Sequence, residues 1–438
     1  MRHGRRLWIP AVTLLLAAAF FVVGGLSLVG SGASPAAPVS SAPLVHTANA
    51  TPAQTIAGLQ TRLRAVPRDH VAWATLGLAY VQAAKATSAP EYYPKAEGAL
   101  RQSLKLSHTD NFVADAGMAA LAAARHQFSH ALTWAQRGLA TNPANPTLYG
   151  ALADAETQLG RYPEAFAATQ RMIDLSPDTA SLARVSYSWE LRGNIPLATQ
   201  YMQRALDDAA NANDEAFTRY YLGELAFNAG DAAGALAQQQ RALLAAPNAS
   251  APLEGKAKAE AGLGQTDAAL ADFALAVARV PQPSYLLEYG ELLESVGRRA
   301  DAQTQYKLFA VEQRLFAANG VAADVDPTLF YADHGQPARA LRVAQVGVRA
   351  RPFLEMQDAY AWALHVNGRD AEALEWSTKA MALGTRSAAL YYHRGMIEKT
   401  LGQMDAAKND LRQALAINPF FNPLAAPIAR AALDGLGA

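Results

Sequence analysis

From about residue 53 onward, apolar side chains recur three and four positions apart in stretches of about a dozen residues. Polar and charged side chains fill the positions between them. This spacing is typical of helices that bury one face and leave the other in water. The pattern therefore predicts a chain built from many short amphipathic helices, which is an all-α fold.

The helical stretches follow a grid of small residues with a period of about 33 to 38 residues. A glycine lies five residues before most of the alanines that open the second half of each unit, and a proline lies twelve residues after many of them. The alanines are Ala96, Ala131, Ala165, Ala198, Ala235, Ala269, Ala302, Ala340, Ala373 and Ala407.

Residue size explains this grid. The glycine ends the first helix of a unit because it adopts a left-handed conformation without strain. The small alanine lets the second helix approach the first, and the proline ends the second helix because it has no amide hydrogen. A single helix pair cannot bury its apolar face, so we expect neighbouring pairs to stack into one continuous core.

The pattern resembles the tetratricopeptide repeat, whose motif is Trp-x2-Leu-Gly-x2-Tyr followed by Gly, Ala and Pro. Trp73, Leu76, Gly77 and Tyr80 carry the first part of it, and further good copies span 222–247 and 391–419. The resemblance covers about residues 70–420 and implies a right-handed α-solenoid of about ten helix pairs over 69–420. We expect a helix over 53–68 to cap its start and one over 421–438 to cap its end.

The resemblance also implies which side chains face the concave groove, where this family binds proteins or peptides with the first helix of each pair. The predicted partner-binding residues are Arg184, Tyr187, Glu190, Phe217, Tyr220, Tyr221, Glu224, Phe227, Glu291, Glu294, Trp362 and Tyr392. Other implied inward positions are Glu254, Lys258, Glu288 and Asp358. Aromatic anchors flanked by carboxylates suit a partner segment that carries Lys or Arg beside apolar residues. The alternative is that half of these rings pack between repeats and the glutamates are solvated.

The N-terminus predicts a location. Three arginines within residues 1–6 precede an almost wholly apolar stretch, 7–29, which is long enough to cross a bilayer. We expect residues 1–30 to form a signal-anchor with the rest of the chain on the extracytoplasmic side. The alternative is a signal peptide cleaved near Ala33, which would release a secreted or periplasmic protein. Residues 31–52 are rich in Ala, Ser and Pro, and we predict that they form a flexible linker.

Composition and charge exclude several kinds of chemistry. The 438 residues contain 38 basic and 38 acidic side chains and no cysteine. This balance argues against nucleic-acid binding, and the absence of cysteine excludes disulfides and thiolate chemistry. No nucleotide-binding or catalytic motif is present, so we predict no cofactor and no catalytic residue. Asp326, Asp333 and His334 fit helix ends better than a metal site, with Asp326 as an N-cap ahead of Pro327.

The sequence thus predicts a non-catalytic interaction scaffold of a bacterial type, anchored to the cytoplasmic membrane with its repeats outside. Two alternatives stay open. One is an exported envelope assembly factor or chaperone-like holder, and the other is an accessory subunit of an enzyme complex.

Overall fold

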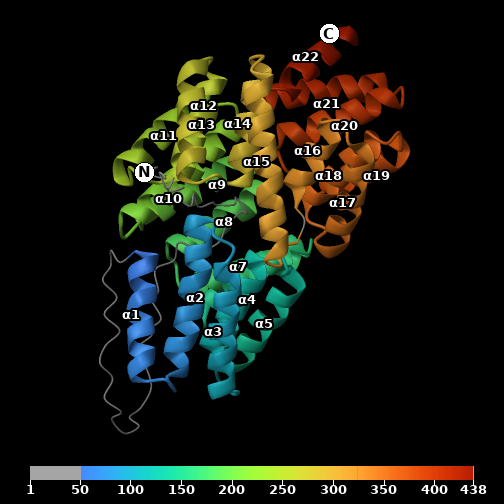
Figure 1. Ribbon diagram of the computed structural model, residues 1–438. Helices are drawn as coiled ribbons and strands as arrows, with labels where there is room; N and C mark the ends of the chain where they lie inside the picture. The colour runs from blue at the N-terminus through green and yellow to red at the C-terminus, as the bar shows by residue number, and fades with distance from the viewer. Residues whose placement is uncertain (1–50, 323, 438) are drawn as a thin grey trace, which may run out of the picture.

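The computed structural model describes residues 51–322 and 324–437, and this part of the chain contains 22 helices and no strand. Helices α2 to α21 form ten pairs, α2/α3 to α20/α21. Figure 1 shows these pairs wound into a coil, with α1 at its start and α22 at its end. The helices are α1 (Pro52–Ala65), α2 (His70–Thr87), α3 (Tyr92–Leu106), α4 (Phe112–Ala124), α5 (Phe128–Thr141), α6 (Pro146–Gln158), α7 (Tyr162–Leu175), α8 (Thr179–Leu191), α9 (Ile195–Asp207), α10 (Ala212–Asn228), α11 (Ala232–Ala245), α12 (Ser250–Gly262), α13 (Thr266–Arg279), α14 (Pro283–Ser295), α15 (Arg299–Ala318), α16 (Val325–Asp333), α17 (Pro337–Ala350), α18 (Leu354–His365), α19 (Asp370–Ala380), α20 (Ala388–Thr400), α21 (Met404–Ile417) and α22 (Ala425–Gly435).

The small-residue grid ends the first helices as expected. A glycine with positive φ follows the first helix of pairs three to ten, from Gly160 (φ 71°) to Gly402 (φ 77°). Pair two has no glycine there, and His126 adopts the same left-handed conformation with φ 58°. The buried His126 ring lies 3.2 Å from Asp324 across a gap of almost 200 residues in sequence. A side chain with long-range contacts therefore stands where the other pairs place glycine.

One predicted helix start is wrong by two residues. α16 begins at Val325, and the N-cap is Asp324 rather than Asp326, because the Asp324 carboxylate accepts a bond of 2.7 Å from the Val325 amide. Asp324 also binds the Arg351 guanidinium at 2.7 Å, which holds its carboxylate at the start of the helix. The end of α16 agrees with the prediction, since the helix ends at Asp333 and Gly335 has a φ of 70°.

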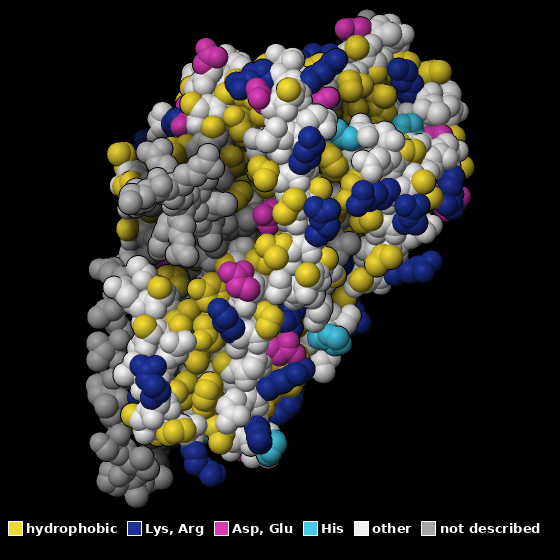
Figure 2. Space-filling model, viewed as in Figure 1, with side chains coloured by type: hydrophobic (Ala, Val, Ile, Leu, Met, Phe, Trp, Pro, Cys, Tyr) yellow, Lys and Arg dark blue, Asp and Glu magenta, His cyan; other side chains and the backbone are white. Residues whose placement is uncertain are grey.

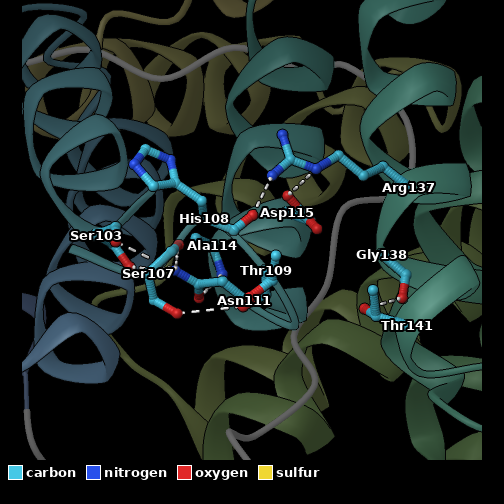
Figure 3. A network of polar contacts seen from close by, with 10 residues as sticks. All are labelled: Ser103, Ser107, His108, Thr109, Asn111, Ala114, Asp115, Arg137, Gly138 and Thr141. Atoms are coloured by element: carbon cyan, nitrogen blue, oxygen red, sulfur yellow. Dashed lines mark hydrogen bonds and ion pairs between the residues drawn. The ribbon is translucent and has the colours of Figure 1, made fainter. Parts of the chain in front are cut away.

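The junction between pairs one and two lacks the usual proline and is fixed by a side chain instead. Asn111 caps α4 by accepting from the Ala114 amide, and its own amide group donates to the Ser103 and Ser107 carbonyls and to the Ser103 hydroxyl (Figure 3). The side chain of Arg137 reaches this loop from α5 and lies 3.4 Å from Asp115. The buried Asn111 thus joins the end of one pair to the start of the next.

The first helix of each pair lies on the inside of the coil. Extensive packing joins first helices of successive pairs, such as α2 with α4, α10 with α12 and α18 with α20, in addition to the packing within each pair. The first helices are also the more buried ones. In α8, for example, ten side chains are buried, whereas in its partner α9 only Ala198, Met202 and Ala205 are. The second helices therefore form the outer wall.

The coil returns on itself after a fixed number of pairs. The turn inside pair two meets the loop after pair seven, where the Gln127 side chain donates to the Gly320 carbonyl at 3.0 Å and the Ala322 amide donates to the Arg125 carbonyl. The same step of five pairs recurs three times. The Leu354 backbone amide donates to the Tyr162 hydroxyl at 2.8 Å, and the Thr385 hydroxyl donates to the Leu191 carbonyl at 2.5 Å. The Asn418 side-chain amide donates to the Phe227 carbonyl at 2.8 Å. We call this line of contacts the inter-turn seam.

Apolar side chains accompany each part of the seam. Phe316, near the end of the long helix α15, packs into the core of the first repeats, and Figure 1 shows α15 reaching down to the helices of the first turn. Leu354 and Leu390 pack against Leu191, and Phe420 packs with Phe227. Extensive helix–helix packing joins only helices at most two places apart in chain order, so loops and helix ends make the seam.

Within the described residues, no helix has both the length and the apolar character that a membrane span requires. The predicted signal-anchor, 1–30, and nearly all of the predicted linker, 31–52, lie outside the described residues.

We expect Asn111→Ala to destabilise the protein by about 2 kcal/mol, because it removes a helix cap and also the side-chain bonds to Ser103 and Ser107 that join pair one to pair two. Asn145→Ala is the matched control. Asn145 caps α6 through the Leu148 amide at 3.1 Å, and this cap is the one side-chain bond found for it among the described residues, so about 1 kcal/mol should be lost. Urea unfolding followed by circular dichroism measures both, and equal losses would contradict the role given to the Asn111 amide.

We also expect Gly193→Ala to be more damaging than Gly297→Ala, although both glycines have positive φ, 69° and 80°. A Cβ at position 193 would collide with the Gly384 carbonyl across the seam, whereas a Cβ at position 297 would meet nothing within 4 Å. The extra loss should be about 2 kcal/mol, a typical cost of overpacking. Thermal unfolding of the two variants checks this, and similar melting temperatures would show that close packing at the seam does not contribute to stability.

Candidate functional site

The candidate site is the concave surface inside the coil, which is lined by the first helices of pairs three to ten. Its side chains come from α6, α8, α10, α12, α14, α16, α18 and α20. Charged and tyrosine side chains dominate it, and most are half-buried rather than sealed in the core. The site is therefore a polar inner surface of a closed coil.

The first polar group of this surface is an ion pair between pairs three and four. Arg184 on α8 binds Asp154 on α6 through two nitrogens, with the closest N–O distance 2.7 Å. The Arg184 side chain is only 6% exposed, and it also donates to the Ala180 carbonyl. A charge that is already paired and buried contributes more to the geometry of the wall than to capturing a partner.

Three carboxylates share one lysine at the middle of the surface. Lys258 on α12 lies 2.7 Å from Glu224 on α10 and 2.8 Å from Glu254 on its own helix. The Tyr220 hydroxyl donates to Glu254 at 3.2 Å. Burial opposes a charge on Lys258, but the surrounding carboxylates raise its pKa well above the ordinary value. Lys258 therefore stays protonated and holds neighbouring pairs together.

The third carboxylate, Glu288 on α14, leaves this group with an excess of negative charge. Burial raises the pKa of Glu288, and the charge of Lys258 lowers it. Burial is also the main cause that raises the pKa of Glu254, to about 8, and the neighbouring Glu288 raises it further. One oxygen each of Glu224 and Glu288 is buried without a hydrogen-bond partner in the described part of the chain.

The surface continues as a second acidic region on α14 and α16. Glu291 accepts from the Asn422 side chain at 2.8 Å, and Glu294 accepts from the Tyr306 hydroxyl at 2.8 Å. Burial raises the pKa of Glu291 to about 8, and the nearby charges of Asp333 and Asp326 raise it further. Burial also raises the pKa of Asp326 to about 7, and the charge of Asp324 contributes.

Two further carboxyl groups of the inner surface come from different turns of the coil. Glu190 lies on α8 and Glu355 on α18, yet burial and then the charge of Glu355 raise the pKa of Glu190 to about 7. Burial likewise raises the pKa of Glu355 to about 7. Burial raises the pKa values of the Tyr187 and Tyr162 phenols, which lie on the first turn, and the charge of Glu355 raises them further. Closure of the coil thus brings acidic groups of both turns together.

The structure divides the predicted partner-binding residues into two groups. Three of them are buried in the core: Phe227 with Ala235 and Ala259, and Trp362 and Tyr392 in the large C-terminal cluster. The Trp362 indole donates to Asp333 at 2.6 Å, so its polar edge is also engaged. The other nine lie along the inner surface: Arg184, Tyr187, Glu190, Phe217, Tyr220, Tyr221, Glu224, Glu291 and Glu294.

Sequence reasoning missed Glu355, Asp326 and Asn422 as members of this surface. Asn422 follows the last helix pair, and Glu355 joins Glu190 only because the coil returns after five pairs. The regular spacing of Gly, Ala and Pro does not indicate that the coil meets itself after five pairs. The hydrophobic pattern reports which face of a helix is buried, not how far successive pairs rotate.

Charge on the described molecule is separated between inside and outside. Figure 2 shows Lys and Arg side chains gathered over α15, α17 and the neighbouring outer helices, and Arg314, Arg339, Arg342 and Arg349 are among the exposed ones. The inner surface carries nine acidic groups on α6 to α18: Asp154, Glu190, Glu224, Glu254, Glu288, Glu291, Glu294, Asp326 and Glu355. The chain is therefore neutral overall, while its inner surface is acidic. Among the described residues, no group of three or more His, Cys, Asp or Glu side chains has the arrangement of a metal site.

Comparison with known proteins agrees with this fold. Residues 388–421 match the tetratricopeptide repeat family. The predicted resemblance is confirmed for that segment, which carries a tetratricopeptide repeat. A search of curated proteins gave no match.

Several solved structures match parts of the chain at low sequence identity. A human IFIT1 dimer with PPP-AAAA is 14% identical, with 83% of this chain and 86% of that chain covered and a TM-score of 0.47. The APC/C hetero-tetramer Cut9-Hcn1 is 14% identical, with coverage of 89% and 84% and a TM-score of 0.39. A tetratricopeptide repeat protein from Parabacteroides merdae is 18% identical, with coverage of 59% and 99% and a TM-score of 0.35.

We expect the free energy of unfolding to fall as pH rises from about 5 to 9, because inner carboxyls with raised pKa values bind protons more tightly folded than unfolded. Stability from Glu291 is present at low pH and is lost as pH rises through about 8. Glu291→Gln should remove part of this slope and add about 1 kcal/mol above that pH, after solvent screening. The exposed Glu375→Gln serves as control, and urea titrations at four pH values would refute the idea if both variants kept the parent slope.

Proposed function

We propose that this protein is a non-catalytic scaffold that holds an extended segment of a protein partner against the inner surface of its coil. The observation that carries the proposal is the excess of carboxylates over cations on that surface, where one lysine serves Glu224, Glu254 and Glu288. A partner that supplies Lys or Arg side chains would complete these interactions.

Aromatic side chains supply the second half of the recognition. Phe217, Tyr220 and Tyr221 form a group of edge-to-face rings on α10, with centroids 4.8 and 5.0 Å apart. All three are only partly buried. Such rings bury large apolar area and keep a polar edge, so they suit apolar side chains placed beside the basic ones. The favoured partner segment therefore alternates basic and apolar residues.

The same proposal includes a location. The basic and then apolar N-terminus supports a bacterial-type signal-anchor, with residues 31–52 as a tether to the coil on the extracytoplasmic side. A cleaved signal would give the same coil in soluble form. Fractionation of the native host, together with the N-terminal sequence of the mature protein, distinguishes the two.

A peptide titration tests the recognition. A fluorescent peptide of alternating Lys and Leu should bind the full chain, and replacement of its lysines by glutamates should abolish binding. The double variant Glu224→Gln, Glu288→Gln should raise the Kd at least tenfold, whereas Glu375→Gln, at an exposed position, should leave the Kd unchanged. Equal Kd values for the double variant and for Glu375→Gln would contradict the proposal.

A crosslinking experiment then identifies the natural partner. A photo-reactive residue at Tyr220 in the full chain, expressed in its own host, should capture one protein in the membrane fraction. The same residue at the exposed position Leu244, on outer helix α11, should not capture that protein. Capture at both positions would show non-specific contact.

A further inference from the structure

The inter-turn seam differs in kind from the packing inside the coil. Successive pairs are joined by long helix–helix interfaces, whereas in the described residues the two turns meet through loops and helix ends at four places along the seam. In these contacts a side chain or amide of one turn bonds with the other, as in Thr385 to Leu191 and Asn418 to Phe227. Separating the turns would break these bonds and expose the apolar side chains that pack across the seam, such as Phe316 and Leu354, while the helix–helix interfaces within each turn stayed in place.

The seam also brings acidic groups of the two turns near one another. Burial and then the charge of Glu355, on the second turn, raise the pKa of Glu190, on the first turn. Glu355 has Arg351, Asp358 and Asp324 around it on the second turn and Tyr187 and Tyr162 on the first. Glu190 has Glu224 and a hydrogen bond from Asn228 on the next helix. At the start of the seam, His126 adopts a left-handed conformation that is costly for a residue with a side chain, and its Nδ1 lies 3.2 Å from Asp324 on the other turn.

We propose that the seam is a gate: the two turns of the coil separate along it as one cooperative unit while the helix pairs remain folded. Opening would give a partner segment sideways access to the inner surface, so that it need not thread through an end of the coil. The inference goes beyond the proposed function, and its test uses no partner.

The glycine at the end of α12 offers a lock for this gate. A Cβ added to Gly262 would lie 3.4 Å from the Cβ of Phe420, on the opposite side of the seam. This separation is close to the Cβ–Cβ distance of a disulfide. Because the natural chain has no cysteine, the double variant Gly262→Cys, Phe420→Cys can form only this bridge within one molecule.

Hydrogen–deuterium exchange of two backbone amides reports opening directly. The Leu354 amide bonds to the Tyr162 hydroxyl, and the Ala322 amide bonds to the Arg125 carbonyl, so both are protected by the other turn. Both amides lie far in sequence from the engineered bridge. We expect oxidation of the double variant to slow their exchange at least tenfold, with little change for the Leu364 amide inside α18. Exchange that is unaffected by the bridge would overturn the proposal, because the contacts would then open locally and independently.

A variant without a bridge tests the same unit in the opposite direction. Thr385→Val removes one seam bond and should speed exchange at both Leu354 and Ala322 by about fivefold, the change expected for a bond of about 1 kcal/mol. Thr378→Val is the control, because Thr378 bonds only within its own helix, to the Leu374 carbonyl. Faster exchange in helix interiors as well would mean that the turns separate only when the repeats unfold.

Discussion

The rest of this structure depends on one rotational constraint. Each helix pair is turned relative to the previous one by an amount that returns the chain to itself after five pairs, so that the turn inside a pair meets the loop five pairs later. That return encloses the inner surface and brings Glu190 to Glu355. It also explains why Gly160 and Gly230 are needed for close approach, since an added Cβ would lie 2.8 and 2.7 Å from carbonyls of the other turn.

This closure changes what kind of solenoid the protein is. Repeat arrays are usually stabilised by contacts between immediate neighbours alone, so that stability adds up along one dimension. Here bonds at separations of 191 to 194 residues join distant pairs. The enclosed surface buries carboxyl groups that an open groove would leave in water, and this burial raises the pKa of Glu254 and of Glu291 to about 8.

The sequence predicted the parts of the fold that are encoded locally. The glycines with positive φ, the second helices opened by alanine and the end of α16 all follow from residue size and hydrogen-bonding capacity. It could not predict closure, because the rotation between pairs depends on how side chains of two helix pairs interlock. For the same reason it placed Trp362 in a groove, whereas the structure buries that ring among His365, Tyr392 and His393. A side chain on the inner face of a first helix can thus belong to the core.

The fixed step of five pairs also bears on how such a chain can evolve. Repeat arrays commonly lengthen by duplicating a unit, and an open solenoid tolerates this because each unit needs only its neighbours. A pair duplicated between pairs five and seven would shift every seam partner by one unit at once. His126 would then face a loop that lacks Asp324 and Arg351. Growth at the C-terminal end, beyond Asn418, would leave the existing partners in register.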